Sequence, residues 1–176
     1  MNNIEPKINP ADLARSVLEH YLENGFPPKL PEDLPSEYDA QAGVFVSLKK
    51  SGSLRGCIGT VYPTRGNLAE EIAANAVSAA RNDPRFPPVN REELPDLSIS
   101  VDILSAMERI RKISELDPKK YGVLVRSGSR SGLLLPDLEG VNTVDDQLAI
   151  VRKKAGIASG EPVELYRFTV TRYGEK

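Results

Sequence analysis

The sequence that decides the fold runs Gly43-Val44-Phe45-Val46-Ser47-Leu48-Lys49-Lys50-Ser51-Gly52-Ser53-Leu54-Arg55-Gly56-Cys57-Ile58-Gly59-Thr60. Its first part has a period of two, which would place Val44, Val46 and Leu48 on one face of a strand and Phe45, Ser47 and Lys49 on the other. Ser51-Gly52-Ser53 is typical of a tight turn, and Leu54 to Thr60 would form the returning strand. The stretch predicts a β-hairpin whose second strand carries the only cysteine of the chain.

Three further segments predict helices, because each begins with an Asn or Thr that can cap the first turn and ends at a residue that disfavours continuation. They run from Asn9-Pro10 to Gly25, from Asn67 with Glu70 to Asp83-Pro84-Arg85-Phe86-Pro87-Pro88, and from Thr143 with Asp146 to Gly156. Alternating patterns predict a strand over Leu97 to Ile103, a second hairpin from Tyr121–Arg126 and Gly132–Leu135, and a closing strand over Val163 to Val170. The prolines between 27 and 35 predict an extended connection.

Two hairpins, isolated strands and intervening helices, without strict βαβ alternation, predict an α+β fold with a mainly antiparallel or mixed sheet flanked by helices. A chain of 176 residues with 40% hydrophobic and 27% charged residues suits one folded domain over 1–176. A doubly wound parallel sheet is disfavoured.

The charge balance and the cysteine count exclude several classes of protein. Lys and Arg number 23 against 25 Asp and Glu, so no overall positive field draws the chain to nucleic acid or anionic lipid. The sequence contains no membrane-spanning run, and residues 1–9 lack the apolar core of a signal peptide. A single cysteine forms no intramolecular disulfide, so we expect a cytoplasmic protein without a membrane anchor.

Cys57 is the most interesting candidate for chemistry, with two readings. Free cysteines usually pack as small buried hydrophobes. Here Gly56 and Gly59 flank the thiol and would let a ligand or another chain approach, and Arg55 could favour a thiolate or hold an anion. An ordinary ion pair between Arg55 and a carboxylate is an equal alternative. The only histidine, His20, lies on the first predicted helix and is interpreted as a solvated surface residue rather than a base for Cys57.

Asp83-Pro84-Arg85-Phe86-Pro87-Pro88 is the second candidate, because prolines would hold Arg85 and Phe86 in fixed directions, although it also suits a plain helix stop. One Cys and one His without metal-ligand spacing predict no zinc site. The acidic pairs Glu70-Glu71, Glu92-Glu93 and Asp145-Asp146 leave a magnesium site open but are better explained as helix-start charges.

The sequence contains only weak signs of nucleotide or nucleic-acid binding. The sequence holds no phosphate-binding glycine loop, so no cofactor is predicted. Gly56-Cys57-Ile58-Gly59 matches a bare GxxG, but in a strand context that differs from the RNA-clamping loop. Arg109-Ile110-Arg111-Lys112 is interpreted as a solvated basic face.

The chain resembles the AMMECR family, named after the AMME syndrome candidate region. The resemblance covers roughly Pro10 to Tyr173. It rests on Gly43-Val44-Phe45-Val46-Ser47-Leu48, Leu54-Arg55-Gly56-Cys57-Ile58-Gly59-Thr60, Asn75-Ala76, Asp83-Pro84-Arg85-Phe86-Pro87-Pro88, Tyr121-Gly122-Val123 and Gly132-Leu133-Leu134-Leu135-Pro136. It implies two unequal subdomains with a cleft between them, the heptapeptide as the functional element, and a Memo-like protein and a radical SAM enzyme as partners. The second cysteine that some relatives carry in the final helix is missing here, which argues against a mechanism with two thiols in one chain.

Two functions follow as expectations. In the first, the chain is a binding or adaptor domain that holds a small anionic ligand, a peptide or a partner protein without turnover. In the second, it is an enzyme with Cys57 as nucleophile or acid/base and with Arg55 and Arg85 as anion binders. The residues expected at the ligand are Arg55, Gly56, Gly59, Thr60, Asn75, Asp83, Arg85 and Phe86. RNA binding is a third and weaker alternative.

Overall fold

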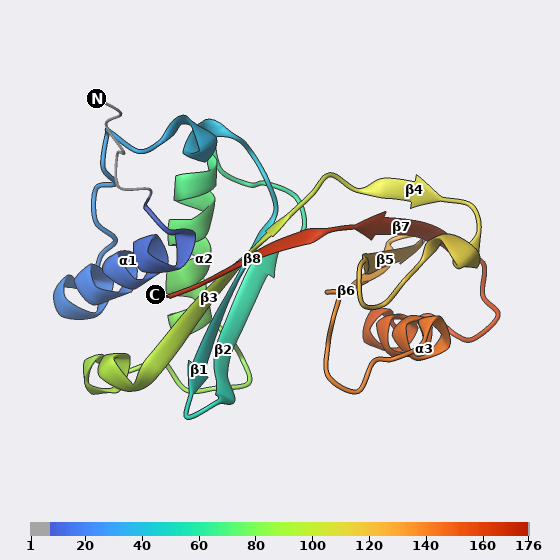
Figure 1. The fold of residues 1–176 in the computed structure, drawn as a ribbon. Coiled ribbons are helices and arrows are strands. Elements are labelled where there is room, and N and C mark those ends of the chain that lie inside the picture. The colour runs from blue at the N-terminus through green and yellow to red at the C-terminus, as the bar shows by residue number, and fades with distance from the viewer. Residues whose placement is uncertain (1–7, 176) are drawn as a thin grey trace. The chain divides into compact units, whose positions relative to one another are not determined.

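A computed structural model describes residues 8–175 (Figure 1). Its contacts divide the described residues into two compact units, one from residues 8–103 and 172–175 and one from residues 104–171. Each unit contains one four-stranded sheet. The α+β class and the antiparallel pairing predicted from the sequence are therefore confirmed, but with two sheets rather than one. The cleft between subdomains stays a prediction.

Unit 1 is a sheet with the strand order β2-β1-β3-β8 and two long helices. Its elements are α1 (Pro10–Asn24), the 3-10 turn η1 (Ser36–Asp39), β1 (Val44–Lys50), β2 (Ser53–Thr60), α2 (Leu68–Arg81), the 3-10 turn η2 (Arg91–Asp96), β3 (Leu97–Leu104) and β8 (Val170–Gly174). β1 pairs antiparallel with both β2 and β3, so the predicted hairpin is present. The prolines between 27 and 35 form no strand, as expected.

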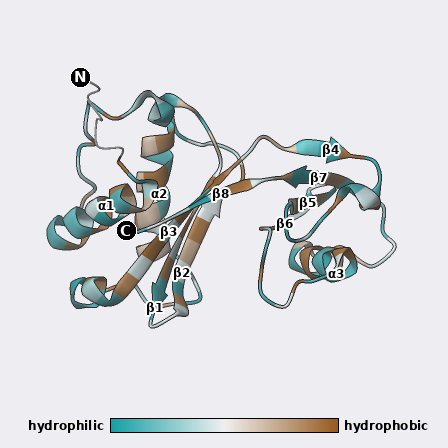
Figure 2. Ribbon diagram, in the orientation of Figure 1, coloured by the Kyte–Doolittle hydropathy of each residue, from teal (hydrophilic) through white to brown (hydrophobic). Residues whose placement is uncertain are grey.

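Helix boundaries in unit 1 follow the predicted capping residues. The Asn9 side chain accepts a hydrogen bond from the Ala11 amide, and Gly25 ends α1 in the left-handed conformation at φ 82°. The Asn67 side chain accepts a hydrogen bond from the Glu70 amide at the start of α2. Both helices carry hydrophobic and hydrophilic residues (Figure 2).

The core of unit 1 joins both helices to one face of the sheet. From the sheet it receives Val44, Val46, Leu48, Ile99 and Val101. Because side chains alternate along a strand, Phe45, Ser47 and Cys57 belong to the other face. The fold thus presents the cysteine on the face of the sheet opposite the helices.

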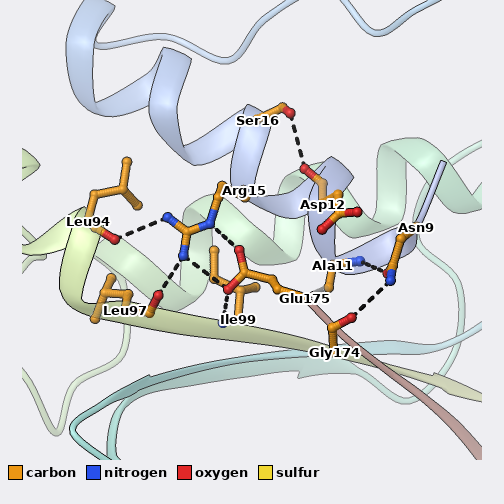
Figure 3. A network of polar contacts seen from close by, with 10 residues as sticks. All are labelled: Asn9, Ala11, Asp12, Arg15, Ser16, Leu94, Leu97, Ile99, Gly174 and Glu175. Carbon is orange, nitrogen blue, oxygen red and sulfur yellow. Dashed lines mark hydrogen bonds and ion pairs between the residues drawn. The ribbon is translucent and has the colours of Figure 1, made fainter.

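The end of the chain closes unit 1 through a polar network around Arg15 (Figure 3). The Arg15 guanidinium donates to the carbonyl oxygens of Leu94, at 3.1 Å, and Leu97, at 2.5 Å, and forms an ion pair with Glu175. The Glu175 carboxylate also accepts a hydrogen bond from the Ile99 amide at 2.7 Å. These contacts tie α1, β3 and residue 175 together, so unit 1 is complete only when the chain returns from unit 2.

Unit 2 has a sheet with the strand order β4-β7-β5-β6. Its elements are β4 (Glu108–Ile110), the 3-10 turn η3 (Ile113–Glu115), β5 (Gly122–Ser127), β6 (Arg130–Leu134), α3 (Val144–Ala155) and β7 (Glu164–Phe168). The predicted second hairpin and the third helix are present, with a capping box at Thr143 and Gly156 in the left-handed conformation. β4 was not predicted, and the single closing strand is in fact two, β7 and β8, because Thr169 lies outside both.

The helices of residues 8–175 include none that is long and apolar enough to cross a membrane.

Candidate functional site

The segment Leu54–Thr60 forms most of β2, which is an edge strand of its sheet. Its pairing with β1 skips Arg55, since Leu48 pairs with Gly56 and Lys49 with Leu54. Arg55 is therefore the extra residue of a β-bulge, and bulges redirect the side chain of the residue that is left unpaired.

Arg55 forms a two-point ion pair with Glu93. Its Nε and Nη2 donate to the two carboxylate oxygens of Glu93 at 2.9 and 2.8 Å, and its Nη1 donates to the carbonyl oxygen of Pro87 at 2.9 Å. The hydrogen bonds from Arg55 are the largest cause that lowers the pKa of Glu93, to about 2. Only 14% of the Arg55 side chain is exposed, so its donors are largely used by the protein itself. Sequence spacing gives no sign of this partner, which follows 38 residues later.

Asp83 closes the free edge of β2 at Cys57. Its Oδ2 accepts a hydrogen bond from the Cys57 amide at 2.9 Å, while the Nη2 of Arg85 donates to the Cys57 carbonyl oxygen at 3.3 Å. The two side chains satisfy the backbone groups that a neighbouring strand would otherwise bind. The structure thus brings the loop after α2 directly to the cysteine.

Arg85 is held in place by Asp83. Its Nε and Nη2 donate to the two oxygens of that carboxylate at 3.0 and 2.8 Å. These hydrogen bonds are the largest cause that lowers the pKa of Asp83, against the opposing effect of burial, and the Cys57 amide adds to them. Asp83 is buried, with 2% of its side chain exposed, whereas 56% of the Arg85 side chain is exposed. Phe86 is half-buried. The central carbon of the Arg85 guanidinium lies over its ring, 5.6 Å from the ring centre.

The Cys57 thiol is half-buried and receives a hydrogen bond from the Ser47 hydroxyl at 3.2 Å. The pKa of Arg85 is raised, first by its hydrogen bonds to Asp83, against the opposing effect of burial. Sequence reasoning did not select Ser47, although its register opposite Cys57 follows from the predicted hairpin.

The space beside Gly56 and Gly59 is filled by other residues of the protein and is not open to a ligand. A Cβ at Gly56 would lie 2.3 Å from the Ala79 carbonyl oxygen of α2, and a Cβ at Gly59 would lie 2.3 Å from the ring of Phe45. Both glycines let neighbouring elements pack closely.

Thr60 and Asn75 belong to a separate, buried network. The Asn75 amide donates to the Thr60 hydroxyl at 3.1 Å, and that hydroxyl donates to Glu71 at 2.6 Å. Glu71 is 1% exposed and also accepts hydrogen bonds from the amides of Thr64 and Arg65. Burial is the largest single influence on the pKa of Glu71, but these hydrogen bonds together outweigh it and lower that pKa. Glu71 lies in the first turn of α2, as expected for a helix-start charge, but its carboxylate is buried and also anchors the loop between β2 and α2.

Other candidate groups do not join the site. His20 lies on α1, on the helical side of the sheet, and is half-buried against Phe26 rather than solvated. No group of three or more His, Cys, Asp or Glu side chains within residues 8–175 is arranged to hold a metal ion. The site therefore reduces to Cys57 with Ser47, Asp83 and Arg85 around it, and with Arg55 behind the loop.

Comparisons with known proteins place this arrangement in a family. A Thermotoga maritima protein is 57% identical over 160 residues, which cover 89% of this chain and 92% of that protein. A longer Clostridium acetobutylicum protein is 52% identical over 165 residues, which cover 93% of this chain but 35% of that protein. The crystal structure of an uncharacterized protein from Pyrococcus horikoshii superposes with a TM-score of 0.88 at 33% identity, covering 95% of this chain and 90% of that chain. The sequence profile of the AMMECR1 family matches residues 11–173, so the chain belongs to the AMMECR1 family.

Proposed function

We propose that the chain is a binding or adaptor domain that holds an anionic ligand, or an acidic group of a partner protein, at Arg85, beside the segment Leu54–Thr60. The proposal rests on the orientation and the exposure of the Arg85 side chain. Its guanidinium is fixed by Asp83 on the Nε side, yet 56% of the side chain is exposed. Its Nη1 has no hydrogen-bond partner among residues 8–175. A guanidinium that is already oriented loses little entropy when it binds a carboxylate or phosphate.

Arg55 has a positioning role in this proposal. It holds the carbonyl oxygens of Pro87 and Pro88, which follow Arg85 closely in the same loop. Its ion pair with Glu93 fixes the far end of that loop. Arg55 thus supports the loop that presents Arg85, and we assign the ligand contact to Arg85 alone.

The proposed partners are a Memo-like protein and a radical SAM enzyme, which the family resemblance implies. The Clostridium acetobutylicum relative supports a domain that works beside another one, because this chain corresponds to 35% of that longer protein. A binding role also fits the position of the single histidine, which lies on the opposite side of the sheet from Cys57 and is no base for it.

Co-purification tests the proposal directly. The tagged full chain, expressed in its native host, should retain the Memo-like or the radical SAM protein, and Arg85→Ala should reduce retention about tenfold or more. Arg91→Ala is the matched control, because Arg91 is a 63% exposed arginine that also pairs with a carboxylate, Glu23. Equal retention by the native chain and by folded Arg85→Ala would contradict the proposal, as would turnover by the chain alone.

A second candidate function, a thiol enzyme, is favoured by the surroundings of Cys57. Its sulfur accepts a hydrogen bond from the Ser47 hydroxyl, and the Arg85 guanidinium binds the carbonyl oxygen of the same residue, so a cation lies beside Cys57 as it does at reactive cysteines. In this alternative Arg85 would orient an anionic substrate for attack by the thiolate. Native Cys57 should then react with iodoacetamide well below pH ~8.5, the ordinary value for a free cysteine. A thiol that reacts at no pH until the chain unfolds rules this function out.

A further inference from the structure

A hollow in unit 2, separate from the residues discussed above, has a volume of about 380 Å³. Two short segments line it, Arg109–Arg111 around the end of β4 and Val163–Leu165 at the start of β7. Its volume falls in the range of surface pockets that receive ligand groups, roughly 300–1,000 Å³.

The charges around the hollow are unbalanced. Arg109 pairs with Glu164 at 2.9 Å, but 64% and 41% of these two side chains are exposed, and such a pair exchanges partners readily. Arg111 is exposed, and its guanidinium has no partner among the described residues. Lys112 follows it directly and is exposed as well, but the Glu115 carboxylate lies near Lys112 and accepts hydrogen bonds from the amides of Arg111 and Lys112. The Arg111 guanidinium is therefore the cation of the lining for which the described residues supply no partner.

The hollow lies where the end of β4 pairs with the start of β7, since Ile110 pairs with Leu165, and β4 also has a free edge. β4 is the terminal strand of its sheet and pairs only with β7, on one side. Figure 2 shows β4 as mainly hydrophilic. Ile110, which is 5% exposed, anchors the strand in the core of unit 2. The outer backbone groups of β4 have no partner among residues 8–175, and a free edge of this kind accepts an added strand.

We propose that this basic edge, defined as Arg109–Lys112 with the hollow beside it, binds an extended acidic segment of a partner polypeptide. The segment pairs with β4 as an added strand. Its carboxylates bind Arg111 and Arg109, and Arg109 gives up its ion pair with Glu164. A polypeptide is favoured over RNA, because the free edge of β4 can pair with a polypeptide backbone and the lining contains no aromatic ring on which bases could stack. This site goes beyond the function proposed for unit 1 and shares no residue with it.

The test uses the full chain and a capped eight-residue peptide of alternating Glu and Val as probe. Calorimetry or NMR titration should detect binding that weakens in about 0.5 M salt. Arg111→Ala should weaken it about tenfold. Arg111→Glu should abolish it and create binding of the matching peptide of alternating Lys and Val. Arg111 lies outside β4 and is exposed, so these variants should fold normally.

The matched control is Lys153→Ala, which removes an exposed cation from α3 and should bind the acidic peptide as the native chain does. Arg85→Ala, which removes the cation proposed for unit 1, separates the two sites, because it should keep the binding that Arg111→Ala weakens. Loss of binding in Arg85→Ala together with normal binding in Arg111→Ala would overturn the inference while leaving the function of unit 1 intact. It is equally overturned if the native chain binds no acidic peptide, or if only a single-stranded RNA oligonucleotide binds at Arg111.

Discussion

The two hairpins of the molecule, β1–β2 in unit 1 and β5–β6 in unit 2, solve the same packing problem in the same way. Gly56 in β2 lies against the Ala79 carbonyl oxygen of α2, and a Cβ there would approach it to 2.3 Å. Gly132 in β6 lies against the Val151 carbonyl oxygen of α3, where a Cβ would approach to 2.7 Å. In each unit a glycine in the second strand of the hairpin lets a helix backbone lie directly on the strand.

The resemblance extends to a second pair of glycines. Gly59 faces the ring of Phe45 in the adjacent strand, and Gly122 faces the ring of Phe168 in the same manner. Since unit 2 uses these devices without a cysteine, the glycines of Leu54–Thr60 are explained by packing. What distinguishes the first hairpin is Cys57, where the second hairpin has Leu133, together with the charged pair of Asp83 and Arg85 at its edge.

Gly56→Ala should have the largest effect on stability. The new methyl group must displace the backbone of α2, so we expect the free energy of unfolding to fall by about 3 kcal/mol. Gly132→Ala has more room and should cost about 2 kcal/mol. Urea unfolding measures both. If Gly56→Ala is as stable as the native chain, close packing does not explain the glycine at this position. Contact of Gly56 with a ligand would then be the better explanation.

Asp83→Ala should have the next largest effect, because it removes a buried carboxylate that accepts hydrogen bonds from the Cys57 amide and the Arg85 guanidinium. We expect a loss of about 2.5 kcal/mol in urea unfolding at neutral pH. Glu161→Ala in unit 2 also removes an acceptor of an arginine, Arg130, but should cost less, because Glu161 is 26% exposed against 2% for Asp83. Equal losses at the two positions would show that burial of Asp83 does not set its contribution.

Glu93→Gln tests whether the ion pair between Arg55 and Glu93 stabilises the fold, through the dependence of stability on pH. The pKa of Glu93 falls from an ordinary 4.5 to about 2 in the folded chain, so its contribution is fully present above about pH 4.5 and is lost as the pH falls toward 2. The free energy of unfolding of the variant should be about 1.5 kcal/mol lower than that of the native chain at neutral pH. It should also depend less on pH in the acid range, because the variant has no carboxylate to protonate at this position. Urea unfolding from pH 7 to 2 should show the two curves converging. Parallel curves would mean that the Arg55–Glu93 pair does not support the fold.

How far the sequence predicted this molecule depends on the range of each interaction. Caps at Asn9, Asn67 and Thr143 and the alternation of β1 and β3 are local, and each predicted element is present. β4 has only three residues, too few for a period to show, so it was missed. The ion pair of Arg55 with Glu93 and the burial of Glu71 depend on contacts made only after the chain folds, and a carboxylate in sequence carries no sign of its partner.

Cys57→Ser should have the smallest effect on stability. The thiol is half-buried and its position in the second hairpin is filled by a hydrophobe, so we expect a change within about 0.5 kcal/mol. The same variant should keep its partner if the binding function is correct and lose turnover if the enzyme function is correct. A large loss of stability would show that the thiol is a core residue after all.

The central claim is that Arg85 is the cation presented beside Cys57, and the sole cysteine of the chain reports on it. The measurement is the ratio of the alkylation rates of native Cys57 by anionic iodoacetate and by neutral iodoacetamide at the same pH. A guanidinium near the sulfur attracts the anionic reagent by about 1 kcal/mol at 4 Å in water, so the ratio should fall about threefold to fivefold in Arg85→Ala and stay unchanged in Arg91→Ala. An identical ratio in the native chain and in Arg85→Ala would contradict the account.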